Sequence, residues 1–317
     1  MWIYNMKLLK RTVLEISVRY YKPRRAILYV PGNDLKKINK IQSLTIDCVA
    51  LDCEDGVALN KKDEARYTIR ESLNRLIPDI KNKTDIGVRI NSVDSEICEK
   101  DLEVCLSGNY LPHTILLPKV EDSGQLHWFS DCIDKYIKQR DKINLIIFLE
   151  SAKAFINISE ICKTLVTLAD KQKIIPNSLV FGSDDYCASI GATRTEDATE
   201  VLYARQKLVL YAKAYNFQAI DMVYIKFKDL EGLIRQSEQG RHMGFTGKQV
   251  IHPDQIEVVQ KSFSPTLVQV EWAKGLLRAF EEHQIKGIGA FTYEGSMIDM
   301  PTIKQAQNII ELMNSIK

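Results

Sequence analysis

Eight short apolar runs, rich in β-branched side chains, alternate with helix-like segments along most of this chain of 317 residues. Continuously apolar runs separated by helices predict parallel strands that are covered on both faces. Eight such units within about 230 residues match the size of a (β/α)8 or TIM barrel. A doubly wound sheet is the alternative, but no G-x-G-x-x-G turn follows any run. The runs are Ala26–Val30, Cys48–Leu51, Ile86–Ile90, Thr114–Leu117, Leu145–Leu149, Ser178–Phe181, Ile220–Tyr224 and Lys248–Ile251.

The sequence after the eighth run has a different pattern. Gln269–His283 is predicted to be a helix, three glycines follow, and a last helix begins near Met300. We therefore expect a barrel domain over residues 24–264 and a helical extension over residues 265–317. The extension is too long to be a mere closing helix. We expect it to cover the active site or to reach a neighbouring subunit.

The N-terminal segment is strongly basic. Residues 1–25 contain seven basic side chains and one acid, together with many apolar residues. This composition is typical of a mitochondrial transit peptide, which we place at residues 1–23, although an ordinary basic tail is the alternative. The remaining chain is mildly acidic without a long basic stripe, which argues against nucleic acid as a partner. No apolar run reaches the roughly 18 residues of a membrane span.

The seven cysteines are scattered and form no C-x-x-C pair. An odd number without metal-binding spacing argues against both a disulfide framework and a zinc site. We expect reduced thiols that are buried as small apolar side chains.

Charged residues follow at least five of the eight runs. In a parallel barrel these positions meet at one mouth, where active sites lie. Charge at a single strand end is commonplace, but charge at five ends on one rim suggests a site. Carboxylates suit Mg²⁺, and an arginine can hold a substrate carboxylate by two hydrogen bonds. The residues concerned are Asp52, Glu54, Asp55, Arg89, Asn91, Lys119, Glu121, Glu150, Asp184, Asp185 and His252.

Two further features of the predicted rim have more than one interpretation. Asp34 can cap the helix after the first run, and Lys36 and Lys40 could bind phosphates there or form an ordinary solvated face. His252 could be an acid or base, although a structural histidine is the more common case.

Ten motifs resemble the citrate lyase beta-subunit family within the pyruvate-dependent HpcH/HpaI aldolase superfamily. The resemblance runs from residue 24 nearly to the end of the chain. Its motifs are 25–34, 51–57, 62–66, 88–91, 117–121, 181–186, 203–205, 244–248, 251–253 and 295–299.

The resemblance implies a TIM barrel that assembles as a homotrimer in the mitochondrial matrix and uses Mg²⁺ with acyl-CoA substrates. It makes Glu150 and Asp185 the metal ligands and Arg89 the residue that holds the substrate. It makes Asp299 the catalytic acid, delivered to a neighbouring protomer. Residues implied to contact CoA or to line its groove are Tyr29, Lys36, Lys40, Gln249, Val250 and Met297.

Some positions beside the implied metal ligands depart from the family or have an open role. Relatives usually have Glu at the position of Asp184 and Thr at that of Ser151, and changes around metal ligands can cost roughly 10- to 100-fold in affinity. Glu54 and Asp55 could support Arg89 or the metal's waters, or they could be structural partners of Lys119 or Arg66. We place Glu54, Asp55 and Asp184 around the site rather than in it.

The implied reaction is reversible cleavage of (3S)-citramalyl-CoA to acetyl-CoA and pyruvate, with malate or β-methylmalate synthase as a side activity. One alternative is a synthase and thioesterase that acts mainly on acetyl-CoA and glyoxylate. Another is a non-catalytic CoA-binding regulator, which the presence of Arg89, Glu150, Asp185 and Asp299 argues against. A third, a barrel that handles phosphoenolpyruvate, predicts no affinity for CoA.

Overall fold

The computed structural model describes residues 22–79, 84–137, 142–171, 173–285 and 291–316. The proposed transit segment lies almost entirely outside these residues. The chain divides into two compact units. We call Arg24–Phe263 the barrel unit and the segment from Ser264 onwards the C-terminal unit.

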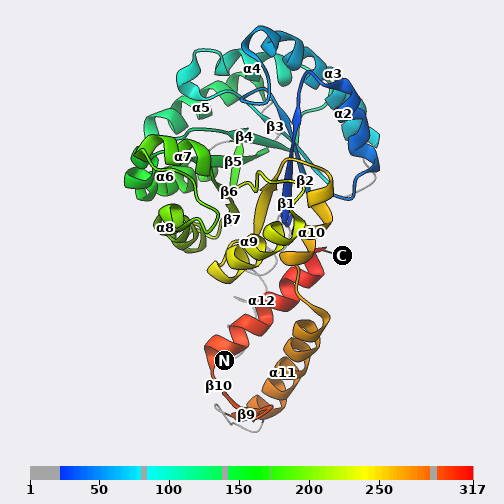
Figure 1. The fold of residues 1–317 in the computed structure, drawn as a ribbon, viewed down its shortest axis with the longest axis vertical. Helices are drawn as coiled ribbons and strands as arrows, with labels where there is room; N and C mark the ends of the chain where they lie inside the picture. Colours follow the sequence, from blue (N-terminus) through cyan, green and yellow to red (C-terminus); the bar gives the residue numbers. More distant parts are fainter. Residues whose placement is uncertain (1–21, 80–83, 138–141, 172, 286–290, 317) are drawn as a thin grey trace. The chain divides into compact units, whose positions relative to one another are not determined.

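Eight parallel strands of the barrel unit close into a barrel in sequence order (Figure 1). This confirms the predicted TIM barrel and excludes the doubly wound sheet. The strands are β1 (Ala26–Pro31), β2 (Cys48–Asp52), β3 (Asp85–Arg89), β4 (Thr114–Leu117), β5 (Ile143–Leu149), β6 (Ile174–Phe181), β7 (Gln218–Asp221) and β8 (Gly247–Val250).

Helices connect successive strands and surround the barrel (Figure 1). Asp34 caps the first of them, as the sequence suggests, because its carboxylate accepts a hydrogen bond from the Lys37 N–H. The helices are α2 (Leu35–Lys40), α3 (Lys62–Asp79), α4 (Cys98–Cys105), α5 (Ser123–Tyr136), α6 (Ala152–Lys171), α7 (Ser183–Ile190), α8 (Leu202–Ala214), α9 (Leu230–Met243) and α10 (Asp254–Ser262).

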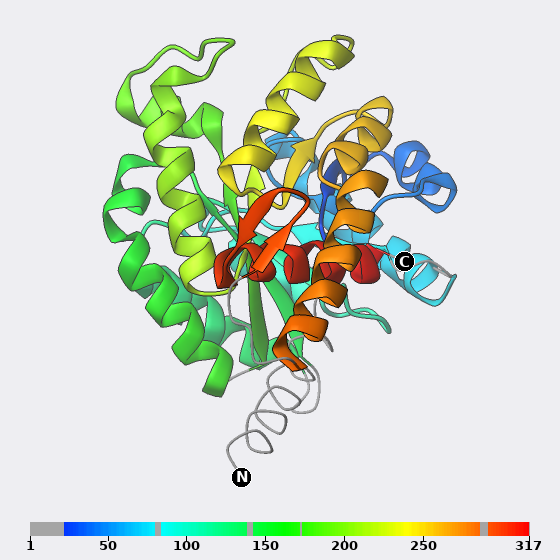
Figure 2. The same cartoon turned by 90° about the horizontal axis from the view of Figure 1, so that it is seen from below.

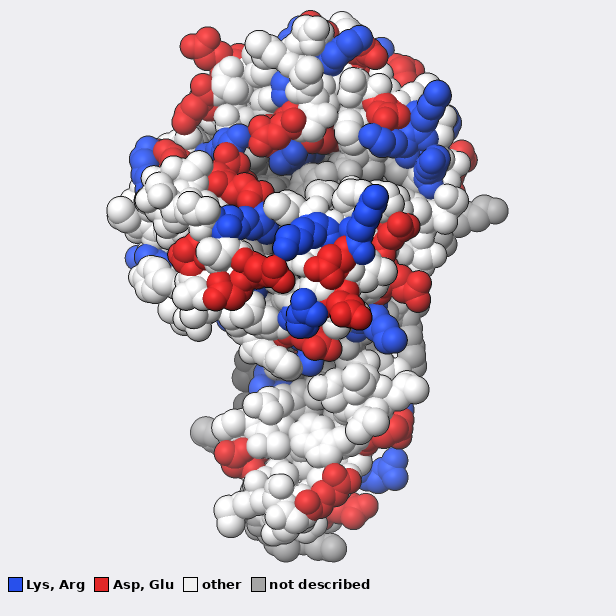
Figure 3. Space-filling view, viewed as in Figure 1, with Lys and Arg blue, Asp and Glu red and all other residues white. Residues whose placement is uncertain are grey.

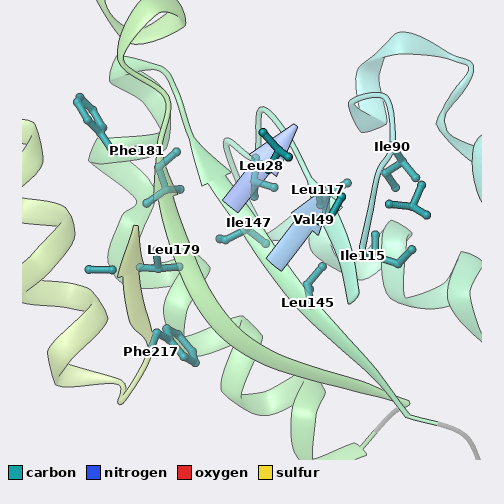
Figure 4. Packing of buried hydrophobic residues seen from close by; sticks show 14 of the residues in the cluster. Leu28, Val49, Ile90, Ile115, Leu117, Leu145, Ile147, Leu179, Phe181 and Phe217 are labelled. Carbon is teal, nitrogen blue, oxygen red and sulfur yellow. The ribbon is translucent and has the colours of Figure 1, made fainter. Parts of the chain in front are cut away.

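The strands are apolar on both faces because each face is buried. Ile27, Ala50 and Phe148 fill the interior of the barrel. Alternate residues such as Leu28 and Val49 point outwards into the layer between strands and helices, which Figure 4 shows from close by. All seven cysteines are free and buried, as predicted.

Strand β7 lies earlier in the chain than the sequence predicts. The apolar run suggests 220–224, whereas β7 begins at Gln218 and ends at Asp221. Both polar ends are buried with partners: Gln218 accepts a hydrogen bond from the Arg24 N–H, and Asp221 pairs with Arg205. Paired polar groups therefore occupy strand positions that a purely apolar pattern misses.

In the C-terminal unit, α11 (Leu267–Ile285) packs beside α12 (Met300–Ile316). A short antiparallel hairpin of β9 (Phe291–Tyr293) and β10 (Ser296–Ile298) lies between them in sequence (Figure 2). Glu294 and Gly295 both have positive φ in its turn, as a two-residue type I′ turn requires. The glycine-rich stretch therefore ends in a hairpin that the sequence analysis does not anticipate.

None of the described helices has the length and apolar character needed to cross a membrane. On the face of the barrel unit in Figure 3, acidic and basic side chains are mixed.

Candidate active site

The carboxyl ends of β2 to β6 present the charged residues of the candidate site. Because all strands run in the same direction, these ends lie at one mouth of the barrel. Asp52 and Arg89 are the last residues of β2 and β3, and they are register partners. Lys119 and Glu150 follow β4 and β5, and Asp185 lies in the first turn of α7 after β6.

Arg89 is held by two carboxylates and an aromatic ring. Its Nε and Nη2 donate to the two oxygens of Asp52 at 2.8 and 2.6 Å, and its Nη1 lies 2.8 Å from Glu54 Oε2. Its guanidinium carbon lies 4.7 Å from the centre of the Tyr29 ring, a cation–π contact. The Arg89 side chain is 13% exposed. The guanidinium is thus fixed in direction but still accessible to an anionic group.

Asp52 is among the charged residues that the sequence places at the mouth, but the sequence analysis assigns it no role in the site. Besides Arg89, its carboxylate accepts hydrogen bonds from the Glu54 and Gly56 N–H groups at 2.8 and 2.9 Å. A Cβ on Gly56 would lie 2.5 Å from Asp52 Oδ2, so only glycine allows this close turn. The available signal was an aspartate that ends a buried strand beside the strand that ends in Arg89.

Glu150 and Asp185 are two carboxyl groups whose negative charge is not fully balanced by neighbouring positive side chains. Glu150 is buried, and its Oε2 accepts a hydrogen bond from the Lys119 N–H at 2.9 Å. Burial, followed by the nearby charges of Glu54 and Asp185, raises the pKa of Glu150 to about 8. Burial also raises the pKa of Asp185. Gly182 leaves room for Glu150, because a Cβ there would overlap Glu150 Oε1.

This carboxylate pair fits a hard divalent cation. No group of three or more His, Cys, Asp or Glu residues with metal-binding geometry occurs among the described residues. Zinc-type cages need more protein ligands, whereas Mg²⁺ commonly takes one or two carboxylates and completes its shell with water and substrate oxygens. A bound cation would favour the charged form of both carboxyl groups, whose pKa values are raised by burial and by nearby negative charge.

Tyr29 and Gln249 join the opposite side of the mouth to Arg89. The Tyr29 hydroxyl donates to Gln249 Oε1 at 2.9 Å, and Gln249 Nε2 donates to the Phe181 and Asp221 carbonyls. The neighbouring Val250 side chain points outwards into the core between strands and helices. A contact of Val250 with a ligand in the mouth would therefore have to come from its backbone.

The predicted lysine pair lies on the short helix α2, and both side chains are exposed. Lys36 lines a pocket at the turn between β1 and α2 together with Asn33, Lys37 and Gly56. Lys40 is not among its lining residues. Lys37 is an additional lysine at this pocket that the predicted set omits, and its Nζ pairs with Asp34.

The three residues expected around the site have different partners. Glu54 contacts both Arg89 and Lys119, and Asp55 contacts Lys119 at 3.4 Å. The alternative pairing with Arg66 is wrong among the described residues, because Arg66 binds Asp63 and Asp101. Asp184 pairs with Arg194 and is mostly exposed.

His252 is partly exposed and stacks on Phe227, with ring centres 4.8 Å apart. Its Nδ1 accepts a hydrogen bond from the Asp254 N–H at 3.3 Å. These local contacts agree with the structural interpretation of this histidine.

Met297 and Asp299 belong to the C-terminal unit. Met297 lies on β10 and is 81% exposed. Asp299 precedes α12, where its Oδ1 accepts hydrogen bonds from the Thr302 N–H and hydroxyl at 3.0 and 2.7 Å. These bonds lower the pKa of Asp299, so in this conformation it is a carboxylate rather than a proton donor.

Known proteins with the same fold and sequence pattern are readily found. The model of the HpcH/HpaI aldolase/citrate lyase family matches residues 25–253. The mitochondrial citramalyl-CoA lyase of Rattus norvegicus is 52% identical over 306 residues, which cover 96% of this chain and 90% of the relative. A (3S)-malyl-CoA thioesterase of Cereibacter sphaeroides is 30% identical over 93% of this chain and 96% of its own length.

A solved structure resembles most of the chain. Protein CitE from Mycobacterium tuberculosis, in complex with magnesium, acetoacetate and coenzyme A, superposes with a TM-score of 0.72. The match has 27% sequence identity and covers 92% of this chain and 98% of that one.

Proposed function

This chain belongs to the HpcH/HpaI aldolase/citrate lyase family, and we propose that it is a lyase that cleaves citramalyl-CoA to acetyl-CoA and pyruvate. The observation that carries the proposal is the high identity to a mitochondrial citramalyl-CoA lyase over almost the entire chain. The mouth of the barrel supplies matching chemistry, with an accessible arginine beside a pair of carboxylates that lack a cation.

Glu150 and Asp185 would hold Mg²⁺, and Arg89 would bind the substrate's terminal carboxylate. When bound, the cation would lower the pKa of the tertiary hydroxyl and stabilise the charge that develops on its oxygen. The hydroxyl proton would pass to solvent water in the mouth, the oxygen would become the keto oxygen of pyruvate, and the bond to the acetyl methylene carbon would break. The electron pair passes to that carbon as the enolate of acetyl-CoA, which then takes up a proton. The fixed direction of Arg89 orients the breaking bond.

We assign delivery of that proton to Asp299, acting at the barrel of a neighbouring protomer in a homotrimer. Its low pKa in the isolated unit means that it needs a less polar setting before it can carry a proton. Mixing inactive Asp299→Asn and Glu150→Ala protomers tests the shared site. Regained activity supports it, whereas continued inactivity after demonstrated subunit exchange contradicts it.

The CoA end of the substrate would lie along the first βα turn. Lys36, with Lys40 on the same helix, would bind phosphates of CoA. Tyr29, Gln249, the backbone of Val250 and Met297 would line the path of the acyl chain. The transit-like segment would direct the chain to the mitochondrial matrix, consistent with the mitochondrial location named for the rat relative.

A synthase activity on glyoxylate is the second candidate. Glyoxylate lacks only the methyl group of pyruvate, and one methyl group typically gives about 10- to 200-fold discrimination. Condensation with acetyl-CoA would give malyl-CoA, and hydrolysis of its thioester by water would give malate and free CoA. The similarity to a (3S)-malyl-CoA thioesterase favours this side activity.

The decisive experiment follows pyruvate release from each stereoisomer of citramalyl-CoA, with and without Mg²⁺. We expect release from the (3S) isomer that stops on chelation and is lost in Glu150→Gln. Glu196→Gln is the control, because Glu196 is an exposed acid whose carboxylate pairs with Lys226. No release from either isomer would refute the lyase, and acetyl-CoA with glyoxylate would then be assayed.

A further inference from the structure

Lys119 contacts the candidate site through both its backbone and its side chain, and the two contact different residues. It follows β4 and adopts φ of 53°, in the left-handed region that costs a non-glycine residue roughly 1–2 kcal/mol. In this conformation its N–H donates to Glu150 Oε2 at 2.9 Å. The strained backbone therefore fixes one oxygen of the buried carboxylate.

The Lys119 side chain binds the other part of the site. Its Nζ lies 2.7 Å from Glu54 Oε1, and the second Glu54 oxygen lies 2.8 Å from Arg89 Nη1. Asp55 is 3.4 Å away, and the Lys119 side chain is 36% exposed at the mouth. Glu54 is thus bound between two cations, one of which is the substrate-orienting arginine.

Without the Lys119 ammonium group, Glu54 would be a third negative charge near the proposed metal site. It is buried, and it shares Lys119 with the metal-site carboxylate: the Lys119 ammonium contacts Glu54, and the Lys119 N–H contacts Glu150. Loss of the ammonium would leave this corner of the rim more negative and would free one Glu54 oxygen to turn towards the carboxylate pair.

We propose that Lys119 is a positioning residue that keeps Glu54 on Arg89 and limits the affinity of the Glu150–Asp185 pair for Mg²⁺. The inference rests on the metal site proposed above. It makes an unusual prediction, since removal of one charge should strengthen metal binding and weaken catalysis together. A merely structural role would weaken both.

The test measures Mg²⁺ binding to the metal-stripped full-length chain by calorimetry, alongside kcat for citramalyl-CoA. Lys119→Met keeps the stem and the left-handed cost but removes the charge. At an effective dielectric between protein and water, loss of a nearby positive charge should tighten Mg²⁺ binding about three- to tenfold. We expect kcat to fall at least about tenfold, because Arg89 loses a fixed partner.

Two further variants test whether the effect comes from the positive charge of Lys119. Lys119→Arg restores the charge and should return both values towards those of the natural chain. Lys153→Met removes a rim lysine that pairs with Glu121 and Asp122, and it should change neither value. If Lys119→Met fails to fold, Lys119→Asn serves instead, because asparagine tolerates left-handed backbone well.

The outcomes separate this inference from the proposed function. Unchanged or weaker Mg²⁺ binding in folded Lys119→Met overturns the role of Lys119 while the metal site stands. Absence of Mg²⁺ binding in the natural chain overturns the metal site, and the inference with it. Tighter binding with unchanged kcat overturns the positioning of Glu54.

Discussion

Two arginine–aspartate pairs lie at opposite ends of β3, and they serve different purposes. Asp85 begins the strand and binds Arg24, whereas Arg89 ends it and binds Asp52. The first pair is sealed, with side chains 1% and 0% exposed. The second lies at the mouth, where the arginine is partly open. The same two residue types therefore occur in two environments only a strand's length apart.

The two pairs differ in whether their surroundings balance their charge and complete their hydrogen bonds. At the closed end, the Thr114 hydroxyl donates to Asp85 at 2.7 Å, and the Arg24 N–H donates to Gln218. At the open end, Glu54, Glu150 and Asp185 add negative charge that neighbouring side chains only partly balance. A buried ion pair with all its partners supports the fold, whereas the same pair beside excess charge is ready to bind a ligand.

Replacement of Arg24 should have the largest effect on stability. Arg24→Met leaves Asp85 buried without its cation, which typically costs about 3–5 kcal/mol. We expect Arg89→Met to cost clearly less, because Asp52 keeps two backbone N–H donors and Glu54 keeps its pairing with Lys119. Urea unfolding of both variants measures the difference. Equal losses of unfolding free energy in the two variants would contradict the view that only the Arg24–Asp85 pair mainly supports the fold.

Replacement of Arg89 by lysine should have the next largest effect, and on activity rather than stability. Lysine keeps the charge but cannot make the two parallel bonds to a carboxylate. Hydrogen bonds to charged groups contribute about 1.5–3 kcal/mol, so kcat/KM for citramalyl-CoA should fall about 100-fold. The melting temperature should stay close to that of the natural chain. A normal kcat/KM would remove Arg89 from its substrate role.

A third ion cluster combines the two properties, because it is fully buried like the Arg24 pair but contains two cations and one acid. Lys248 and Arg205 share Asp221 in the layer between the barrel and its helices, and burial lowers the pKa of Lys248 to about 8. The unfolded chain therefore binds more protons between pH 8 and 10.5, so stability should rise across this window. Lys248→Met should abolish that rise.

The effect of Lys248→Met on the free energy of unfolding should differ between pH 7 and pH 10. At pH 7 the charged lysine is buried at a cost, so Lys248→Met should be more stable by about 1–2 kcal/mol, after loss of the bond to Gln236. At pH 10 the advantage should vanish or reverse. Unfolding measured at both pH values, with the exposed Lys261→Met as a control, decides this. A gain that does not change with pH would contradict the assignment.

Loss of the Tyr29 hydroxyl should have the smallest effect. Tyr29→Phe removes the bond to Gln249 but leaves the ring under Arg89. A net hydrogen bond contributes about 0.5–1.5 kcal/mol, so kcat/KM should fall only about two- to tenfold. Tyr29→Leu also removes the ring and should cost more. A loss above about 100-fold in Tyr29→Phe would indicate direct contact of the hydroxyl with the reacting atoms.

The sequence predicts the barrel well because its strands are buried on both faces and therefore read as apolar runs. It fails where polar residues are buried with partners, as at Gln218 and Asp221 in β7. The hairpin of the C-terminal unit is missed because its strands have only three residues each and too little periodicity.

In the candidate site, too, the sequence predicts some features and misses others. Strand ends identify which charged residues share the mouth, including Arg89 and Glu150. They do not reveal pairing, because that depends on register and backbone conformation. Asp52 holds Arg89 through strand register, and Lys119 reaches Glu150 only because its backbone is left-handed. Neither property has a local sequence signal.

The burial of every cysteine makes this chain a good substrate for site-specific labelling. Burial raises the pKa of the Cys162 thiol to about 12, and all seven thiols lie inside the barrel unit. Maleimide dyes react with exposed thiolates, so the natural chain should label slowly. Cysteines introduced at the exposed Leu59 and Ile285 positions would then accept a donor and an acceptor dye without removal of any natural thiol. Energy transfer between them would measure the separation of the two units in solution and show whether it changes during turnover.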